Sequence, residues 1–252
     1  MFIIESLPNY FDEEILNNIN NKTKPLGALG TLESLALQLC KIQLSKEKSR
    51  NKDFFDNESD IDSFSPTLVS PHLMIFAGDH GVAAEGVSIA PSEVTGQMVS
   101  NFSQGGAAIN VFCRQFGWEM SIIDAGILTE PMFEIDVINQ RLGNITKAIN
   151  KAPAMTVEQL EQGFKLAKQR INEVVNAGCN VIAFGEMGIG NTTVASAIMS
   201  AITGFSPEDT VGRGTGVSDD IVERKKKVVA QALALHKERL SDPISLLACL
   251  GG

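Results

Sequence analysis

Three short apolar runs, each ending at a segment that contains a glycine and an acidic residue, constrain the fold of this chain most strongly. The runs cover residues 73–77, 121–125 and 180–184, and they end at Gly78-Asp79, at Asp124-Ala125-Gly126 and at Gly185-Glu186. Apolar runs of this length are typical of strands buried on both faces, as in a parallel sheet. Helices are predicted between them at 91–116 (with a break at Gly105-Gly106), 156–178, 191–203 and 218–240. The alternation predicts an α/β fold, a Rossmann-like parallel sheet flanked by helices.

The N-terminal region has a different character. Helices are predicted at 11–20 and 31–45, and the second carries an apolar stripe of Leu32, Leu35, Leu39 and Ile42. A basic run and then an acidic, Asn/Ser-rich segment follow, which indicates a solvated linker up to Pro66. We therefore expect helices plus a linker at 1–65 and an α/β nucleotide-binding domain at 66–252.

Charge and cysteine usage exclude several classes of function. The chain has 21 Lys plus Arg against 30 Asp plus Glu, and a net charge of −9 disfavours a nucleic-acid-binding surface. No long uninterrupted apolar run is present, so we expect no membrane span and no secretory signal. The four cysteines are scattered without a Cys-x-x-Cys pair, which is typical of a reduced, cytoplasmic protein. His72 and His236 lack partners at ligand spacing, so no metal site is expected.

The glycine-rich segment at 185–193 is the strongest candidate for a binding site. It passes from strand to glycine turn to helix start, where a backbone free of side chains and an N-terminal helix dipole favour a phosphate. Its spacing resembles a Walker A motif, but Asn191 stands where the lysine is required, so a nucleotide hydrolase is disfavoured. A purely structural turn is the alternative. Glu186 beside the turn favours a function, because a carboxylate is unfavourable next to a phosphate unless it has a role.

A second glycine cluster, Gly212-Arg213-Gly214-Thr215-Gly216, offers backbone donors, a hydroxyl and a cation to an anionic group. The helix after it carries the run 224–227, which contains Lys225. Such a run is usually a solvated helix face, although one lysine could instead turn inward toward the phosphate turn.

The segment Gly78-Asp79-His80-Gly81 is a third candidate. An Asp-His pair at a strand end suits acid/base work or a sugar hydroxyl. The alternative is a tight turn in which Asp79 accepts backbone hydrogen bonds. The sequence leaves both open.

Taken together, these segments resemble the nicotinate-nucleotide–dimethylbenzimidazole phosphoribosyltransferase (CobT) family. The matching segments occur in the family's order and span most of the chain: 24–30, 77–82, 94–99, 105–110, 124–126, 185–193 and 211–216.

The resemblance implies a reaction and a set of site residues. The phosphoribosyl group of nicotinate mononucleotide would pass to 5,6-dimethylbenzimidazole, giving α-ribazole 5′-phosphate and nicotinate for the lower nucleotide loop of cobalamin, without a metal or organic cofactor. Glu186 matches an active-site glutamate of the family. The implied nucleotide and phosphate site comprises Gly188, Ile189, Gly190, Asn191, Thr192, Gly214, Thr215, Gly216 and Lys225, and the implied base pocket comprises Asp79, His80 and Gln97.

The resemblance also implies a homodimer and a longer chain. Family members continue beyond Gly252, through a segment that completes the small helical domain and supplies the family's principal general base. We therefore expect this chain to be truncated and its α/β domain to be incomplete. The alternative function is a catalytically impaired fragment that binds nucleotide without turnover.

Overall fold

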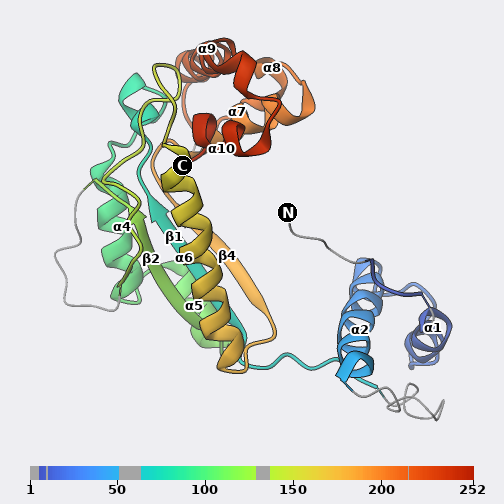
Figure 1. Cartoon of the computed structure of the whole chain (residues 1–252). Helices are drawn as coiled ribbons and strands as arrows, with labels where there is room; N and C mark the ends of the chain where they lie inside the picture. The colour runs from blue at the N-terminus through green and yellow to red at the C-terminus, as the bar shows by residue number, and fades with distance from the viewer. Residues whose placement is uncertain (1–5, 10, 51–63, 129–136, 215) are drawn as a thin grey trace. The chain divides into compact units, whose positions relative to one another are not determined.

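The computed structural model describes residues 6–9, 11–50, 64–128, 137–214 and 216–252. By contacts between residues the chain divides into two compact units, Met1–Leu68 and Val69–Gly252. The first contains α1 (Asp12–Asn20) and α2 (Thr31–Arg50). The elements of the second are β1 (His72–Gly78), a 3-10 helix η1 (Gly81–Glu85), α4 (Glu93–Ser103), α5 (Ala108–Phe116), β2 (Glu119–Gly126), β3 (Val137–Asn139), α6 (Val157–Asn176), β4 (Ile182–Met187), α7 (Asn191–Thr203), α8 (Pro207–Thr210), α9 (Asp219–His236), η2 (Lys237–Arg239) and α10 (Pro243–Leu250) (Figure 1).

In the N-terminal unit, α1 and α2 pack through Phe11, Ile15, Cys40 and Leu44. Two details differ from the sequence prediction. The helix α2 continues through the basic run to Arg50, because lysine and arginine are good helix formers. The predicted apolar stripe is not the packed face, since Leu32, Leu35 and Ile42 are exposed. The remainder of the predicted linker, 51–63, lies outside the described residues.

The second unit is built on a four-stranded sheet in the order β3-β2-β1-β4, and every pairing is parallel. The expected α/β fold with a parallel sheet is thus confirmed. Alternate residues of β1 divide the core into two layers. Leu73, Ile75 and Ala77 pack with α4 and α5 on one face of the sheet, and Met74 packs with Val174 of α6 on the other face (Figure 1).

Most predicted elements form where local signals mark them. The break at Gly105-Gly106 separates α4 from α5, and Thr156 and Gln159 form the predicted capping box of α6. The third strand was placed wrongly: β4 runs past Gly185 and Glu186 to Met187, with Glu186 opposite Phe76 of β1. The short strand β3 was missed, because three residues are too few to carry a pattern.

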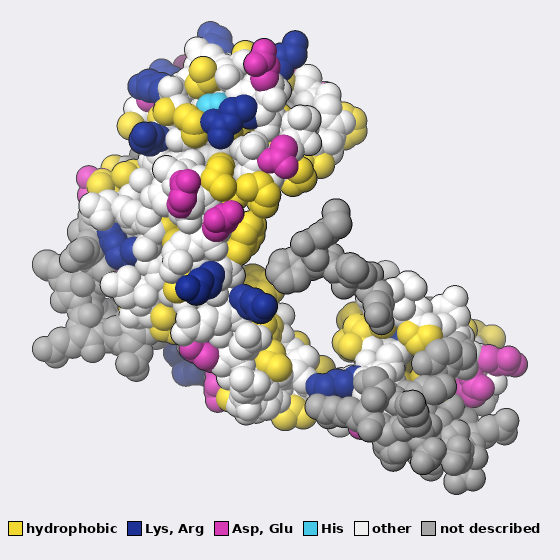
Figure 2. Space-filling view, in the orientation of Figure 1, with side chains coloured by type: hydrophobic (Ala, Val, Ile, Leu, Met, Phe, Trp, Pro, Cys, Tyr) yellow, Lys and Arg dark blue, Asp and Glu magenta, His cyan; other side chains and the backbone are white. Residues whose placement is uncertain are grey.

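The helices α7, α9 and α10 form a separate cluster around buried Val194, Ala197, Val229 and Leu250. Figure 2 shows hydrophobic side chains on the visible face between this cluster and the lower end of α6, and basic and acidic side chains interspersed over the same face. Within the described residues, no helix has the length and apolar character needed to cross a membrane.

Candidate functional site

The sheet order marks one point at which a ligand is expected to bind. The chain moves from β1 outward to β2 and β3 and then returns to place β4 on the other side of β1. In open parallel sheets, ligands bind beyond the carboxyl ends of the strands where the strand order reverses in this way. The carboxyl ends that flank this point are Gly78 of β1 and Met187 of β4, so the segments at 78–81 and 185–193 meet there.

The turn at residues 188–190 packs tightly against the end of β1. A Cβ atom on Gly188 would overlap the carbonyl oxygen of Gly78 and would lie 3.1 Å from ring atoms of His80. Gly190 has φ +100°, and a Cβ there would lie 3.2 Å from the Cβ of His80. Both glycines are therefore required by close approach, and at Gly190 also by backbone conformation.

The turn leads directly into α7, whose first residues present donors. The backbone N–H groups of Gly190 and Thr192 donate to no other described group, whereas the N–H of Ile189 is used internally. Thr192 is an exposed residue. Free N–H groups at the positive end of a helix form an anion-binding arrangement.

Lys225 adds a buried cation to these donors. Its side chain is 2 % exposed, and its Nζ donates to Thr192 Oγ1 at 2.9 Å and to the Gly212 carbonyl oxygen at 3.2 Å. Both acceptors are neutral, and among the described residues no carboxylate forms an ion pair with it. Burial lowers the pKa of the Lys225 ammonium. The inward-turned lysine that the sequence left open is therefore Lys225, while Arg224 and Lys227 are exposed.

The second glycine cluster, at 212–216, places fewer groups beside Lys225 than its residue types suggest. Gly214 lies beside Lys225 and Thr192, and a Cβ there would be 3.4 Å from the Lys225 Nζ. The cation Arg213 is instead paired with Asp219 at the start of α9, and its side chain is 62 % exposed. Gly216 is exposed in open space, with no heavy atom within 4 Å of an added Cβ. Thr215 lies outside the described residues.

Glu186 projects from the end of β4 and accepts a hydrogen bond from the side chain of Asn191. Glu186 also lines a cavity of about 370 Å³ whose other lining residues are mostly apolar, among them Leu73, Met98 and Phe102. Gln97, the residue before Met98 on α4, has an exposed side chain and is not part of that lining. The arrangement joins an anion site, a carboxylate and an apolar cavity along one strand-turn-helix segment.

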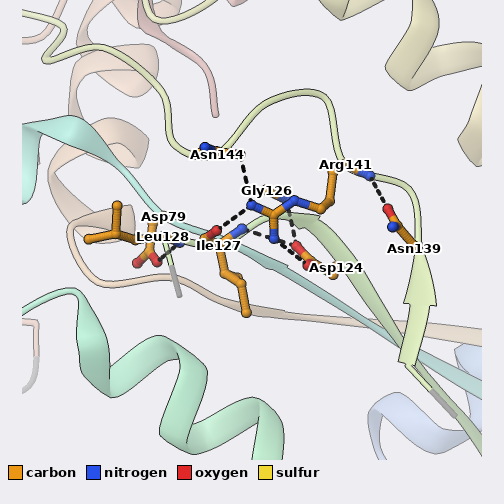
Figure 3. A network of polar contacts seen from close by, with 8 residues as sticks. All are labelled: Asp79, Asp124, Gly126, Ile127, Leu128, Asn139, Arg141 and Asn144. Atoms are coloured by element: carbon orange, nitrogen blue, oxygen red, sulfur yellow. Dashed lines mark hydrogen bonds and ion pairs between the residues drawn. The ribbon is translucent and has the colours of Figure 1, made fainter. Parts of the chain in front are cut away.

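Asp79 and His80 are both buried, and Asp79 lines a cavity of about 280 Å³. Asp79 is 2 % exposed, and its carboxylate accepts a hydrogen bond from the Thr95 hydroxyl. It accepts a second from the N–H of Leu128 (Figure 3). The sequence left open whether Asp79 does acid/base work or accepts hydrogen bonds within a tight turn. In the structure Asp79 accepts hydrogen bonds, but the donors Thr95 and Leu128 are distant in sequence and do not belong to its own turn. His80 is buried under the glycine turn, and burial lowers its pKa to about 4.

Sequence reasoning gave no role to Thr95, Arg141 or Asp124 in this region. Asp124 accepts from the N–H groups of Gly126 and Ile127 and from Arg141, which closes the loop after β2 (Figure 3). Thr95 did carry a signal. It is a polar residue on the same helical face as the core residues Val99 and Phe102, and it is completely buried.

A second cavity of about 280 Å³ opens on the α6 side of the same sheet edge. Leu142, Leu160, Phe164 and Leu247 contribute to its lining, and Gln159 in its wall is already hydrogen-bonded to the Leu142 carbonyl oxygen. Its described lining contains no lysine or arginine, whereas Lys225 lies beside Thr192 at the start of α7. Over the described residues, no cluster of three or more histidine, cysteine, aspartate or glutamate side chains is arranged to hold a metal ion.

A parallel α/β sheet with a glycine turn and a buried lysine at its strand-order reversal is typical of nucleotide-binding enzymes, and comparison with known proteins assigns the family. Residues 4–252 match the model of the phosphoribosyltransferase family, and the chain belongs to that family.

Similar proteins carry a more specific name. The chain is 54 % identical over 252 residues to the nicotinate-nucleotide–dimethylbenzimidazole phosphoribosyltransferase of Pseudoalteromonas translucida, and 51 % identical over 254 residues to that of Shewanella frigidimarina. In both comparisons the whole chain matches 69 % of the relative. The crystal structure of CobT from Thermus thermophilus is similar with a TM-score of 0.82 and 35 % identity, covering 97 % of this chain and 68 % of that one.

Proposed function

We propose that this chain transfers the phosphoribosyl group of nicotinate mononucleotide to 5,6-dimethylbenzimidazole, releasing nicotinate. The observation that carries this proposal is the buried ammonium of Lys225, which has neutral acceptors and no carboxylate partner among the described residues. A buried charge without a counterion is costly, and an anionic ligand removes that cost.

The nucleotide phosphate is assigned to the start of α7. There the N–H groups of Gly190 and Thr192, the hydroxyl of Thr192 and the ammonium of Lys225 lie together. Because Thr192 Oγ1 accepts from Lys225, its own hydrogen remains available to a phosphate oxygen. The backbone around the phosphate is proposed to be formed by Gly188, Ile189, Asn191, Gly214 and Gly216. A phosphate held here fixes the ribose C1 relative to the rest of the site.

The chemistry is a displacement at that C1. The bond from C1 to the nicotinate nitrogen breaks and its electron pair stays on nicotinate, while a benzimidazole nitrogen forms the new bond. The proton on the other benzimidazole nitrogen passes to water. C1 gains cationic character on the way, which a carboxylate nearby stabilises. Glu186, at the end of β4 beside the glycine turn, is the carboxylate we assign to this role.

The flat, apolar acceptor base is assigned to the cavity that Glu186 lines. Leu73, Met98 and Phe102 give it an apolar wall. Gln97 stands at the neighbouring position of α4 and is proposed to contact the base at the cavity's edge. Asp79 and His80, which the resemblance assigns to the base pocket, are proposed to act from beneath the site rather than by touching the base.

We also propose a homodimer located in the cytoplasm. An exposed apolar face of α5, with Val111, Phe112 and Phe116 at 52 %, 58 % and 69 % exposure, supports association with a second copy. Light scattering at micromolar concentration tests the dimer, and a clean monomer contradicts it.

The proposed cytoplasmic location is supported by the four cysteines, which are free and suit a reducing compartment.

The decisive experiment follows nicotinate release by the 252-residue chain with both substrates, alongside calorimetric binding of nicotinate mononucleotide. We expect release, and we expect Glu186→Ala to reduce turnover more than nucleotide affinity. Glu161→Ala, an exposed carboxylate on α6, is the control and should change neither.

Binding without release would favour the alternative, a protein that holds the nucleotide and does not turn it over. Absence of both binding and release would contradict the proposed site. Gly190→Val should abolish nucleotide binding, and an unchanged affinity would remove the glycine turn from the site.

A further inference from the structure

The carboxylate of Asp79 joins elements that are far apart in sequence. Its Oδ1 accepts a hydrogen bond from the Thr95 hydroxyl of α4 at 2.6 Å, and its Oδ2 accepts one from the N–H of Leu128, beyond β2, at 2.7 Å (Figure 3 shows the Leu128 contact). Both oxygens accept from protein groups, and the residue is 2 % exposed. Asp79 thereby links α4 to the segment beyond β2.

Thr95 also contacts the glycine turn at 188–190. Its Oγ1 accepts a hydrogen bond from the N–H of Ile189 at 3.2 Å. A threonine hydroxyl has a single hydrogen, and Thr95 donates it to Asp79 Oδ1. A lone pair of the Thr95 oxygen is left to accept from the N–H of Ile189.

The hydrogen bond from Ile189 to Thr95 fixes the peptide group of Ile189, the central residue of the turn at 188–190. The N–H of Ile189 is held by Thr95, whereas the N–H groups of Gly190 and Thr192 at the start of α7 have no hydrogen-bond acceptor within the described part of the chain. These are the backbone donors assigned above to the nucleotide phosphate. Packing of Gly188 against Gly78 and His80 holds the same turn by shape, but it supplies no directional contact.

We propose that Asp79, acting through the hydroxyl of Thr95, is a positioning residue that orients the glycine turn for phosphate binding. The inference rests on the proposed nucleotide site and adds to it two residues that touch no substrate. It gives Thr95 a role that needs a hydroxyl and not merely its volume.

The neighbouring acidic residue shows that the arrangement is specific to Asp79. Asp124 is also buried, but it accepts from Gly126 and Ile127 at 2.9 and 3.0 Å and from Arg141 at 2.7 Å. These contacts close the loop after β2 and do not reach the glycine turn.

The test is calorimetric binding of nicotinate mononucleotide to the full 252-residue chain and three variants. Thr95→Val keeps the shape and removes the hydroxyl, and it should weaken binding about tenfold. Thr95→Ser restores the hydroxyl and should bind within about twofold of wild type. The control Thr146→Val makes the same substitution at a threonine that accepts from the N–H of Gly81 at 3.3 Å, and it should also stay within about twofold.

Each other outcome has a definite meaning. Unchanged affinity for Thr95→Val, or failure of folded Thr95→Ser to restore it, overturns the inference, as does an equal loss for Thr146→Val. If Thr95→Val does not fold, Asp79→Leu, which removes both acceptor oxygens, is measured instead, and wild-type affinity overturns the inference. Lys225→Met separates the two proposals. If this variant binds nicotinate mononucleotide as wild type does, the proposed nucleotide site itself is wrong. If its affinity falls while that of Thr95→Val is unchanged, the nucleotide site stands and only the positioning role of Asp79 and Thr95 is refuted.

Discussion

The two glycine-rich segments of the α/β unit look alike in sequence and differ in packing. In the turn at 188–190, an added side chain would meet the backbone of β1 and the ring of His80. In the loop at 212–216, Gly212 and Gly216 face open space, and Arg213 is paired with Asp219. The comparison shows that a glycine can be required by close packing, as at Gly188, or can stand where a side chain would meet no neighbour, as at Gly212. Only packing of the first type holds a turn in place against the sheet.

The largest effect should come from Gly188→Ala. The new methyl group would overlap the Gly78 carbonyl oxygen, and a strand at the centre of the sheet cannot move aside. We expect the free energy of unfolding, measured in urea, to fall by about 3 kcal/mol or more. Nucleotide binding should be lost with it, and wild-type stability would contradict the packing described for the turn.

Lys225→Met should separate function from stability. Loss of the ammonium should weaken nucleotide binding by about 100-fold, because a hydrogen bond to a charged group is removed. Without ligand the melting temperature should not fall, since the variant no longer buries an unpaired charge. The neighbouring Lys226, which pairs with Glu223 at 2.5 Å on the surface, offers the matched control Lys226→Met, for which affinity should stay close to wild type.

His80 makes stability depend on pH. Burial lowers its pKa from 6.5 to about 4, so between these values the unfolded chain binds a proton that the folded chain does not. Stability should therefore fall as the pH decreases, by about 2 kcal/mol from this residue at about pH 5. His80→Gln should flatten the slope measured by urea unfolding, leaving the part due to His72, whose pKa burial also lowers. A slope equal to that of wild type would show that His80 is accessible to protons in the folded state.

The smallest effect should come from Gly212→Ala in the second glycine segment. No heavy atom lies within 4 Å of the added methyl group, and the carbonyl oxygen that accepts from Lys225 is retained. Stability should change by less than about 0.5 kcal/mol, and nucleotide affinity should be unchanged. A loss comparable to that of Gly188→Ala would end the distinction between the two segments.

Local signals predicted much of the unit that carries the site. The glycine break between α4 and α5, the capping box of α6 and the start of α7 depend on residues close in sequence, and each was predicted correctly. The end of β4 was misplaced, because a glycine inside a strand cannot be distinguished from one that ends it until its partner strand is known. The apolar stripe of α2 was assigned to the wrong face, because a helix that is apolar on several sides does not identify its packed face.

For the site, the order of residues along the chain was enough to specify which residue types gather at the ends of the strands: glycines, a carboxylate, threonines and a nearby run of cations. Packing in three dimensions settled what each of them does. It turned Lys225 inward and left Arg213 on the surface, and it joined Asp79 to Leu128 and, through Thr95, to Ile189. These contacts connect residues from 16 to 94 positions apart. Spacing along the chain cannot specify such pairs, because the order of strands in the sheet determines which segments become neighbours.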